Sequence, residues 1–76
     1  MKSTYCIITF KSIHHALALE KQAKGIMDGR LIPKPSIVEA GCGMCFASTL
    51  LDETKWKQFL KTNNLNYEKI KQVTFY

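Results

Sequence analysis

Two segments with apolar residues at helical spacing alternate with short runs of β-branched and aromatic residues, and this alternation constrains the fold more than any other feature. Residues 5–10 form the first such run and predict a buried strand. Ser12 then suits the N-cap of a helix over residues 13–27, in which Gly25 weakens the pattern and Gly29 ends it. The apolar positions of this helix are Ala16, Leu19, Ala23 and Ile26 or Met27.

The middle of the chain predicts two further strands. Residues 31–32 form a short strand that ends early, because Pro33 and Pro35 favour an extended conformation without strand pairing. Residues 36–41 are predicted to form a loop, and residues 44–49 a third strand whose alternation is poor.

The last third of the chain predicts a second helix and a final strand. Asp52 suits the N-cap, and Leu51 before it is placed to pack on Trp56 as a hydrophobic staple. The asparagines at residues 63–64 supply a left-handed stop, and residues 73–75 are predicted as the last strand. The buried stripe of the helix is expected to consist of Trp56, Phe59 and Leu60.

This order of elements is the split βαβ pattern, and it predicts one α+β domain over residues 1–76 with the ferredoxin-like βαββαβ topology. The sheet is expected to be antiparallel, with two helices on one face. The first and third strands are antiparallel neighbours in this topology, so Phe10 should lie beside Gly43 and Met44. Cys42 would then lie near the start of the first helix, where unpaired N–H groups and the helix dipole favour a thiolate.

The composition limits the classes of function. With 76 residues and 46% hydrophobic content, the domain has little room for an enclosed active site. The 11 basic and 6 acidic side chains give a net charge of +5, but they are scattered and only Arg30 is an arginine, which disfavours a nucleic-acid interface. Neither a signal-peptide pattern nor a bilayer-length apolar run is present, so we expect a cytoplasmic protein whose three cysteines stay reduced.

Residues 42–45 read Cys-Gly-Met-Cys, the segment that most suggests chemistry. A Cys42 thiolate at an exposed loop end can attack sulfane sulfur, and the small Gly43 leaves room for a partner to approach. A half-buried structural cysteine is the alternative. Cys45 lies inside the predicted third strand, so it either packs there or serves as the resolving thiol of a CxxC pair. Cys6, in the middle of the first strand, is predicted to be part of the core.

Ser12, His14 and His15 lie at the predicted start of the first helix, which places them near Cys42 as candidate binding residues. Neighbouring side chains on a helix diverge by about 100°, so the two histidines cannot easily share one metal ion. Either imidazole is a candidate for facing Cys42 and stabilising its thiolate, and a solvent-exposed imidazole is the alternative.

Residues 10–17 with Glu20, then residues 31–35, then Cys42 followed by Gly43, resemble the small selenium/sulfur carrier-like proteins of bacteria. The resemblance runs through nearly the whole chain. It implies a ferredoxin-type domain in which the cysteine after a proline-containing loop is the attachment point for sulfur or selenium, a role that falls on Cys42. The second cysteine of the CxxC pair is not part of the resemblance.

The resemblance also implies that residues 12–15 face Cys42, and that the protein is a carrier for a donor or acceptor enzyme rather than an enzyme itself. A metal-binding or thiol-redox module using Cys42 and Cys45 is the alternative, although one histidine would bring the ligands to only three. An RNA-binding domain is a third possibility, but residues 43–46 lack its basic-glycine-aromatic signature. We therefore expect a protein partner, with no cofactor, metal, membrane or nucleic acid.

Overall fold

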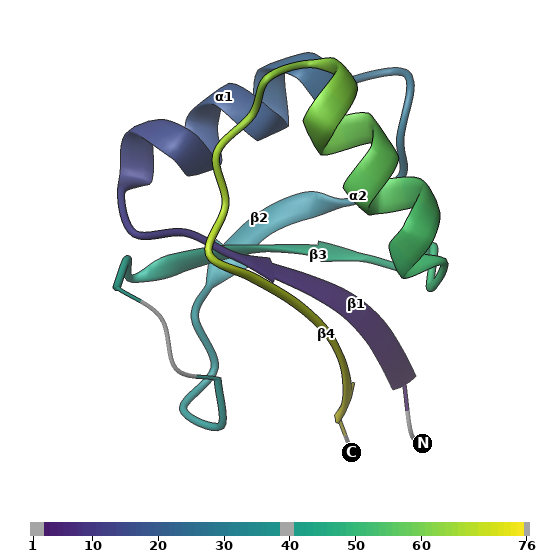
Figure 1. Ribbon diagram of the computed structural model, residues 1–76. Helices are drawn as coiled ribbons and strands as arrows, with labels where there is room; N and C mark the ends of the chain where they lie inside the picture. The colour runs from purple at the N-terminus through teal and green to yellow at the C-terminus, as the bar shows by residue number, and fades with distance from the viewer. Residues whose placement is uncertain (1–2, 39–40, 76) are drawn as a thin grey trace.

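The computed structural model describes residues 3–38 and 41–75, and its elements follow the predicted order. The four strands form one antiparallel sheet in the order β2-β3-β1-β4, and both helices lie on the same face of it (Figure 1). This arrangement confirms the ferredoxin-like α+β fold. In chain order the elements are β1 (Ser3–Thr9), α1 (Ile13–Ala23), β2 (Arg30–Pro33), β3 (Met44–Ser48), α2 (Glu53–Thr62) and β4 (Lys69–Phe75).

β1 is a central strand that is buried on both faces from Cys6 to Thr9. Cys6 and Ile8 belong to the core under the helices, whereas Ile7 belongs to a second cluster on the opposite face of the sheet. Phe10, just past the strand, is also fully buried in the core under the helices. A strand paired on both edges and covered on both faces gives the adjoining turn a rigid support.

α1 begins where the sequence predicted and ends one turn earlier. The Ser12 side chain accepts a hydrogen bond from the His14 N–H at 3.2 Å, which confirms the N-cap. Helical structure stops at Ala23, because Gly25 adopts a left-handed conformation with φ of 77°. The predicted extension to Met27 is therefore wrong, and residues 24–26 form a turn instead.

α2 packs on the sheet through Trp56 and Leu60, both fully buried, with Phe59 partly buried against the same core. Trp56 meets Phe46 of β3 edge to face with ring centroids 5.4 Å apart, and its Nε1 donates to the Leu50 carbonyl at 3.2 Å. The cap at Asp52 and the left-handed stop at Asn64, with φ of 51°, are both confirmed.

The predicted hydrophobic staple involves the wrong leucine. Leu51 is 37% exposed, whereas Leu50, one residue earlier, packs against the core that contains Trp56. Gln72 of β4 donates to the Leu51 carbonyl, so this residue takes part in a backbone tether rather than in apolar packing. The cause is the direction of the chain as it leaves β3, which aims Leu50 at the core.

All four strands have bounds that differ from those predicted, and β1 covers Ser3–Thr9 rather than residues 5–10. β2 extends over Arg30–Pro33, β3 ends at Ser48, and β4 begins at Lys69, four residues before the predicted start. β4 pairs with β1 along its whole length, from Thr9 opposite Lys69 to Ser3 opposite Phe75. Its lysines obscured the strand pattern, but an edge strand tolerates lysines because one of its edges faces solvent.

The face of the sheet away from the helices is partly covered by the segment between β2 and β3. Val38 is fully buried there with Ile7, Cys45 and Ala47. The Lys34 Nζ donates to the Val38 carbonyl at 2.9 Å and so fastens this segment. Within the described ranges, no helix combines the length and apolar character needed to cross a bilayer.

Candidate functional site

The Cys42 turn, residues 41–43, joins the β2–β3 segment to the start of β3. The Cys42 N–H donates to the Phe10 carbonyl at 3.0 Å, and Thr9 lies opposite Cys45 in the sheet register. These contacts confirm that the end of β1 lies beside the beginning of β3. They also hold the backbone of Cys42 close in space to the segment that leads into α1.

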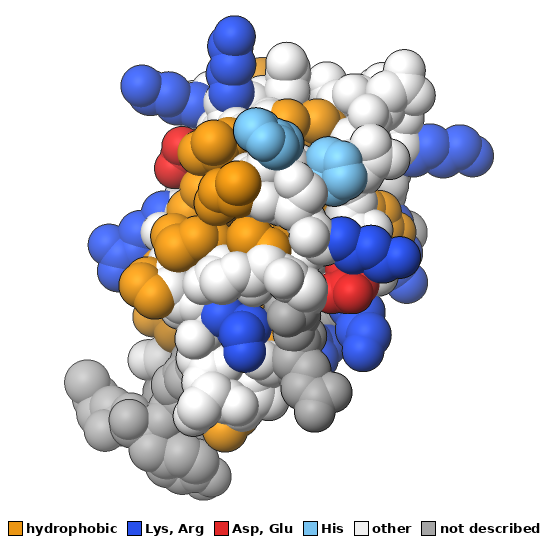
Figure 2. All heavy atoms as spheres, turned by 90° about the vertical axis from the view of Figure 1, so that its left-hand side faces the viewer, with side chains coloured by type: hydrophobic (Ala, Val, Ile, Leu, Met, Phe, Trp, Pro, Cys, Tyr) orange, Lys and Arg blue, Asp and Glu red, His pale blue; other side chains and the backbone are white. Residues whose placement is uncertain are grey.

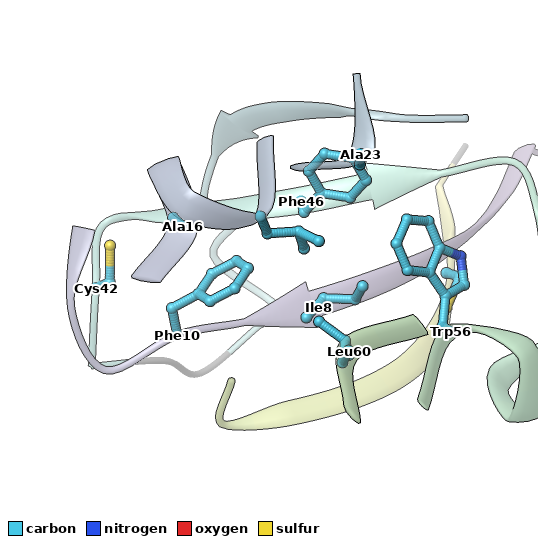
Figure 3. Close-up of a cluster of buried hydrophobic side chains, with 10 residues drawn as sticks. Ile8, Phe10, Ala16, Ala23, Cys42, Phe46, Trp56 and Leu60 are labelled. Atoms are coloured by element: carbon cyan, nitrogen blue, oxygen red, sulfur yellow. The ribbon is translucent and has the colours of Figure 1, made fainter. Parts of the chain in front are cut away.

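The Cys42 sulfur points into the molecule rather than outward. Figure 3 shows the side chain at one end of the helix-side core, with its sulfur directed toward α1 near Ala16. Only 7% of Cys42 is exposed, so the expectation of an exposed loop thiol is wrong. The Phe10 contact causes this, because it draws the turn in against the end of β1.

The sulfur nevertheless has a polar partner. The backbone N–H of Met44 donates to the Cys42 Sγ at 3.4 Å. This contact holds the sulfur in a fixed position beside the first residue of β3. We call such a thiol guarded: the side chain is mostly buried, keeps a small exposed fraction, and accepts one N–H hydrogen bond.

The other two cysteines are less accessible. Cys6 and Cys45 are both 0% exposed. Burial raises the pKa of the Cys6 thiol to about 11, with a further contribution from the Glu53 carboxylate. Burial also raises the pKa of Cys45, and the neighbouring Cys42 adds to this effect while Lys34 opposes it. Both thiols are therefore held in the unreactive protonated form at neutral pH, and Cys6 is a core residue as predicted.

The two cysteines of the CxxC segment lie on opposite sides of the sheet. Cys42 belongs to the cluster under the helices, whereas Cys45 packs with Ile7 and Val38 on the other face. All three cysteines of the chain are free thiols. A disulfide requires the two Cβ atoms to approach each other, so a Cys42–Cys45 bond would need the start of β3 to rearrange.

The three candidate residues at the start of α1 are only partly brought to Cys42. The Ser12 hydroxyl accepts the His14 N–H as the helix cap, and the Ser12 carbonyl accepts the His15 N–H at 3.1 Å. His14 is exposed and His15 is half-buried. Among the described residues no hydrogen bond joins either imidazole to Cys42, and the polar partner of the sulfur is the Met44 N–H instead.

The two glycines of the turn have different roles. A Cβ on Gly41 would lie 3.2 Å from the Lys11 Cα, so the turn approaches the backbone after β1 too closely for most side chains. A Cβ on Gly43 would meet nothing within 4 Å. A side chain at Gly41 would therefore press on the backbone of Lys11, whereas no atom of residues 3–38 or 41–75 would crowd a Cβ at Gly43. Residues 39–40, which include Ala40 of the predicted loop, lie outside the described residues.

Glu68 is a site residue that the sequence analysis missed. Its carboxylate accepts the Gly41 N–H at 3.3 Å, and its own N–H donates to the Thr9 carbonyl at 2.7 Å. It thereby links the Cys42 turn to the end of β1 and to the beginning of β4. Glu68 is 26 residues beyond Cys42, and only the register of β4 against β1 would have revealed the contact.

Lys34 is a second missed residue, on the β2 side of the turn. Its N–H donates to the Gly43 carbonyl at 2.9 Å, while its ammonium group holds the Val38 carbonyl. Among residues 3–38 and 41–75, no group of three or more His, Cys, Asp or Glu side chains is placed to hold a metal ion. The arrangement therefore presents one guarded thiol rather than a ligand cluster.

The fold and the site together define a small α+β domain in which one of three buried thiols, Cys42, keeps a small exposed fraction at a strand end. Residues 5–72 match the protein family described as "Putative Se/S carrier protein-like", and the chain belongs to this family. The match includes Cys42, Gly43 and Glu68. Comparison with curated proteins and with solved structures finds no significant match.

Proposed function

We propose that this protein carries sulfur or selenium as a persulfide or selenosulfide on Cys42, and passes it from a donor protein to an acceptor. Membership of the carrier-like family supports the class of function. The observation that carries the assignment to Cys42 is the hydrogen bond from the Met44 N–H to its sulfur, combined with its residual exposure. Cys6 and Cys45 have no exposure and have raised pKa values.

The transfer step is a thiol exchange that needs no external oxidant or reductant. The Cys42 thiolate attacks the outer sulfur of a donor cysteine persulfide, a new S–S bond forms at Cys42, and the S–S bond of the donor breaks. The donor cysteine leaves as a thiolate and takes up the proton that Cys42 released. A selenosulfide donor would transfer selenium by the same displacement.

Burial of the loaded sulfur suits a carrier. A persulfide that projected into solvent would be lost to any small thiol. The Cys42 side chain is only 7% exposed, so its surroundings limit the access of small thiols to the loaded sulfur. Loading therefore requires the turn to shift outward or a donor to approach over Gly43. The absence of any clash at that glycine supports the second route.

Loading with glutathione persulfide, followed by removal of excess reagent and intact-mass measurement, tests the proposal. The wild-type protein should gain one sulfur atom and release it as sulfide when dithiothreitol is added. Cys42→Ser should gain none, while Cys6→Ser and Cys45→Ser should load normally. Undiminished loading of Cys42→Ser would overturn the assignment.

A further inference from the structure

An apolar band lies on the side of the molecule that carries the Cys42 turn. Figure 2 shows hydrophobic side chains gathered there over the beginning of α1 and the strand ends below it, with lysine or arginine side chains around them. Ile13 and Leu17 of α1 are 40% and 48% exposed. Large apolar side chains grouped on one exposed face mark an interaction surface more often than a plain solvent surface.

The register and the helix geometry place the members of this band together. Residues four apart on a helix share one face, so Ile13 and Leu17 lie side by side on α1. Farther along the same flank, Glu20 and Lys24 line a hollow of about 580 Å³ together with Arg30 of β2. This side of α1 therefore faces β2, with Glu20 and Lys24 near Arg30 at the beginning of the strand. The first turn of α1 lies toward the opposite end of β2, at Pro33.

The strand ends complete the band and connect it to the thiol. Pro33 at the end of β2 is exposed and pairs with Met44 at the start of β3, which is half-buried. Met44 is also the residue whose N–H holds the Cys42 sulfur. We define the docking face as Ile13, Leu17, Pro33 and Met44.

The charges around the docking face are mostly positive. Lys11 is exposed and its backbone lies against Gly41 of the turn. The ammonium group of Lys34 is bound to the Val38 carbonyl on the other face of the sheet, so it is not one of these charges. Lys21 is exposed one helical turn beyond Leu17, and Glu20 is the acidic residue on the same stretch of α1. With a net charge of +5, a second copy of this chain is a poor occupant, whereas an acidic surface is a complementary one.

We propose that the docking face binds the protein that hands sulfur to Cys42: a donor that presents a cysteine persulfide on an apolar surface with an acidic rim. This inference rests on the proposed function and names its partner. Docking there would bring the donor sulfur in over Gly43, where a Cβ would meet no atom of the described residues within 4 Å. Apolar contact would supply affinity, and the lysines would accelerate the encounter.

Transfer from a protein donor and from a small donor should separate docking from chemistry. The probes are a cysteine desulfurase loaded from free cysteine and glutathione persulfide, with loading of Cys42 followed by intact mass. Ile13→Ser and Leu17→Ser should slow transfer from the enzyme about tenfold, the equivalent of one lost apolar contact. Both variants should accept sulfur from glutathione persulfide at the wild-type rate.

The matched control is Ile26→Ser, which removes an isoleucine that is 71% exposed in the turn after α1 and outside the docking face. It should leave both rates unchanged. Raising the salt concentration, or replacing Lys11 by Glu, should slow only the enzyme reaction, whereas Lys57→Glu on α2 should not. These substitutions are at exposed positions and should fold normally.

Three results would overturn the docking proposal while leaving Cys42 as the carrier thiol. One is wild-type transfer from the enzyme that is no faster than transfer from glutathione persulfide. Another is an unchanged enzyme rate in Ile13→Ser and Leu17→Ser. The third is a wild-type dimer in analytical ultracentrifugation that Leu17→Ser dissociates, since the face would then bind a second copy. Failure of glutathione persulfide to load Cys42 would instead refute the carrier function itself.

Discussion

The backbone N–H of Met44 donates to the sulfur of Cys42 across 3.4 Å, so the residue that opens β3 also holds the candidate nucleophile. The same residue contributes its side chain to the core and to the docking face. Strand pairing fixes Met44 through its partner Pro33. Sheet formation therefore sets the position of the donor that faces the thiol.

Removal of the Glu68 carboxylate should loosen the Cys42 turn. In Glu68→Ala the Gly41 N–H loses its acceptor, so the turn should open more often and Cys42 should react with iodoacetamide about two- to tenfold faster, as expected for one lost hydrogen bond. Glu68→Gln keeps an oxygen acceptor and should stay close to the wild-type rate. The measurement is the rate of alkylation at neutral pH, and equal rates for Glu68→Ala and wild type would show that the contact does not hold the turn.

The two glycines of the turn should respond differently to the same substitution. Gly41→Ala should destabilise the protein by about 1 to 3 kcal/mol, because the new methyl group would lie 3.2 Å from the backbone of Lys11. Gly43→Ala should change the free energy of unfolding by less than about 1 kcal/mol, since its methyl group meets no atom within 4 Å. Urea unfolding of both variants tests this difference, and equal losses would contradict the described turn.

Trp56 should dominate the stability of α2 on the sheet. Trp56→Ala removes a fully buried side chain and its hydrogen bond to Leu50, so we expect a loss of about 3 to 5 kcal/mol. Lys57→Ala, at the exposed neighbouring position, serves as the control and should have almost no effect. An unchanged melting temperature for Trp56→Ala would contradict the packing of the helix.

Cys6 should make stability fall at high pH. Burial raises its pKa from an ordinary value of 9.0 to about 11, so between these pH values the unfolded thiol ionises while the folded thiol keeps its proton. Ionisation then favours the unfolded state, and stability should decrease by about 2 to 3 kcal/mol across this window. Lysines also titrate there, so the test is the difference in unfolding free energy between wild type and Cys6→Ala. A constant difference from pH 8 to about 11 would contradict the prediction.

The order of elements was predictable because it depends on local patterns. Ser12 and Asp52 have the side chains that cap helices, and both do so. The bounds of β4 were not predictable, because Lys69 and Lys71 interrupt the apolar pattern of a strand. Only the pairing of these residues with β1 shows that they belong to β4. The exact end of α1 depended on Gly25 adopting a left-handed conformation, which glycine permits but does not require.

The candidate thiol could be chosen from the sequence, but its surroundings could not. Cys42 followed by Gly43 pointed to the turn, and the topology placed that turn beside the end of β1. Its burial and its contact with Glu68 depend on tertiary packing between segments far apart in the chain. The separation of Cys42 from Cys45 by the sheet also needed the structure, because CxxC spacing alone suggests a redox pair.

Mapping the added sulfur in the wild-type protein tests the central claim most directly, because all three thiols compete within one molecule. The protein is loaded with glutathione persulfide, blocked with an alkylating reagent that retains the persulfide, digested, and analysed by tandem mass spectrometry. Fragmentation between Gly43 and Met44 distinguishes Cys42 from Cys45. The account predicts the extra sulfur on Cys42, with Cys6 and Cys45 unloaded. Sulfur found mainly on Cys45, or spread evenly over the three cysteines, would contradict it.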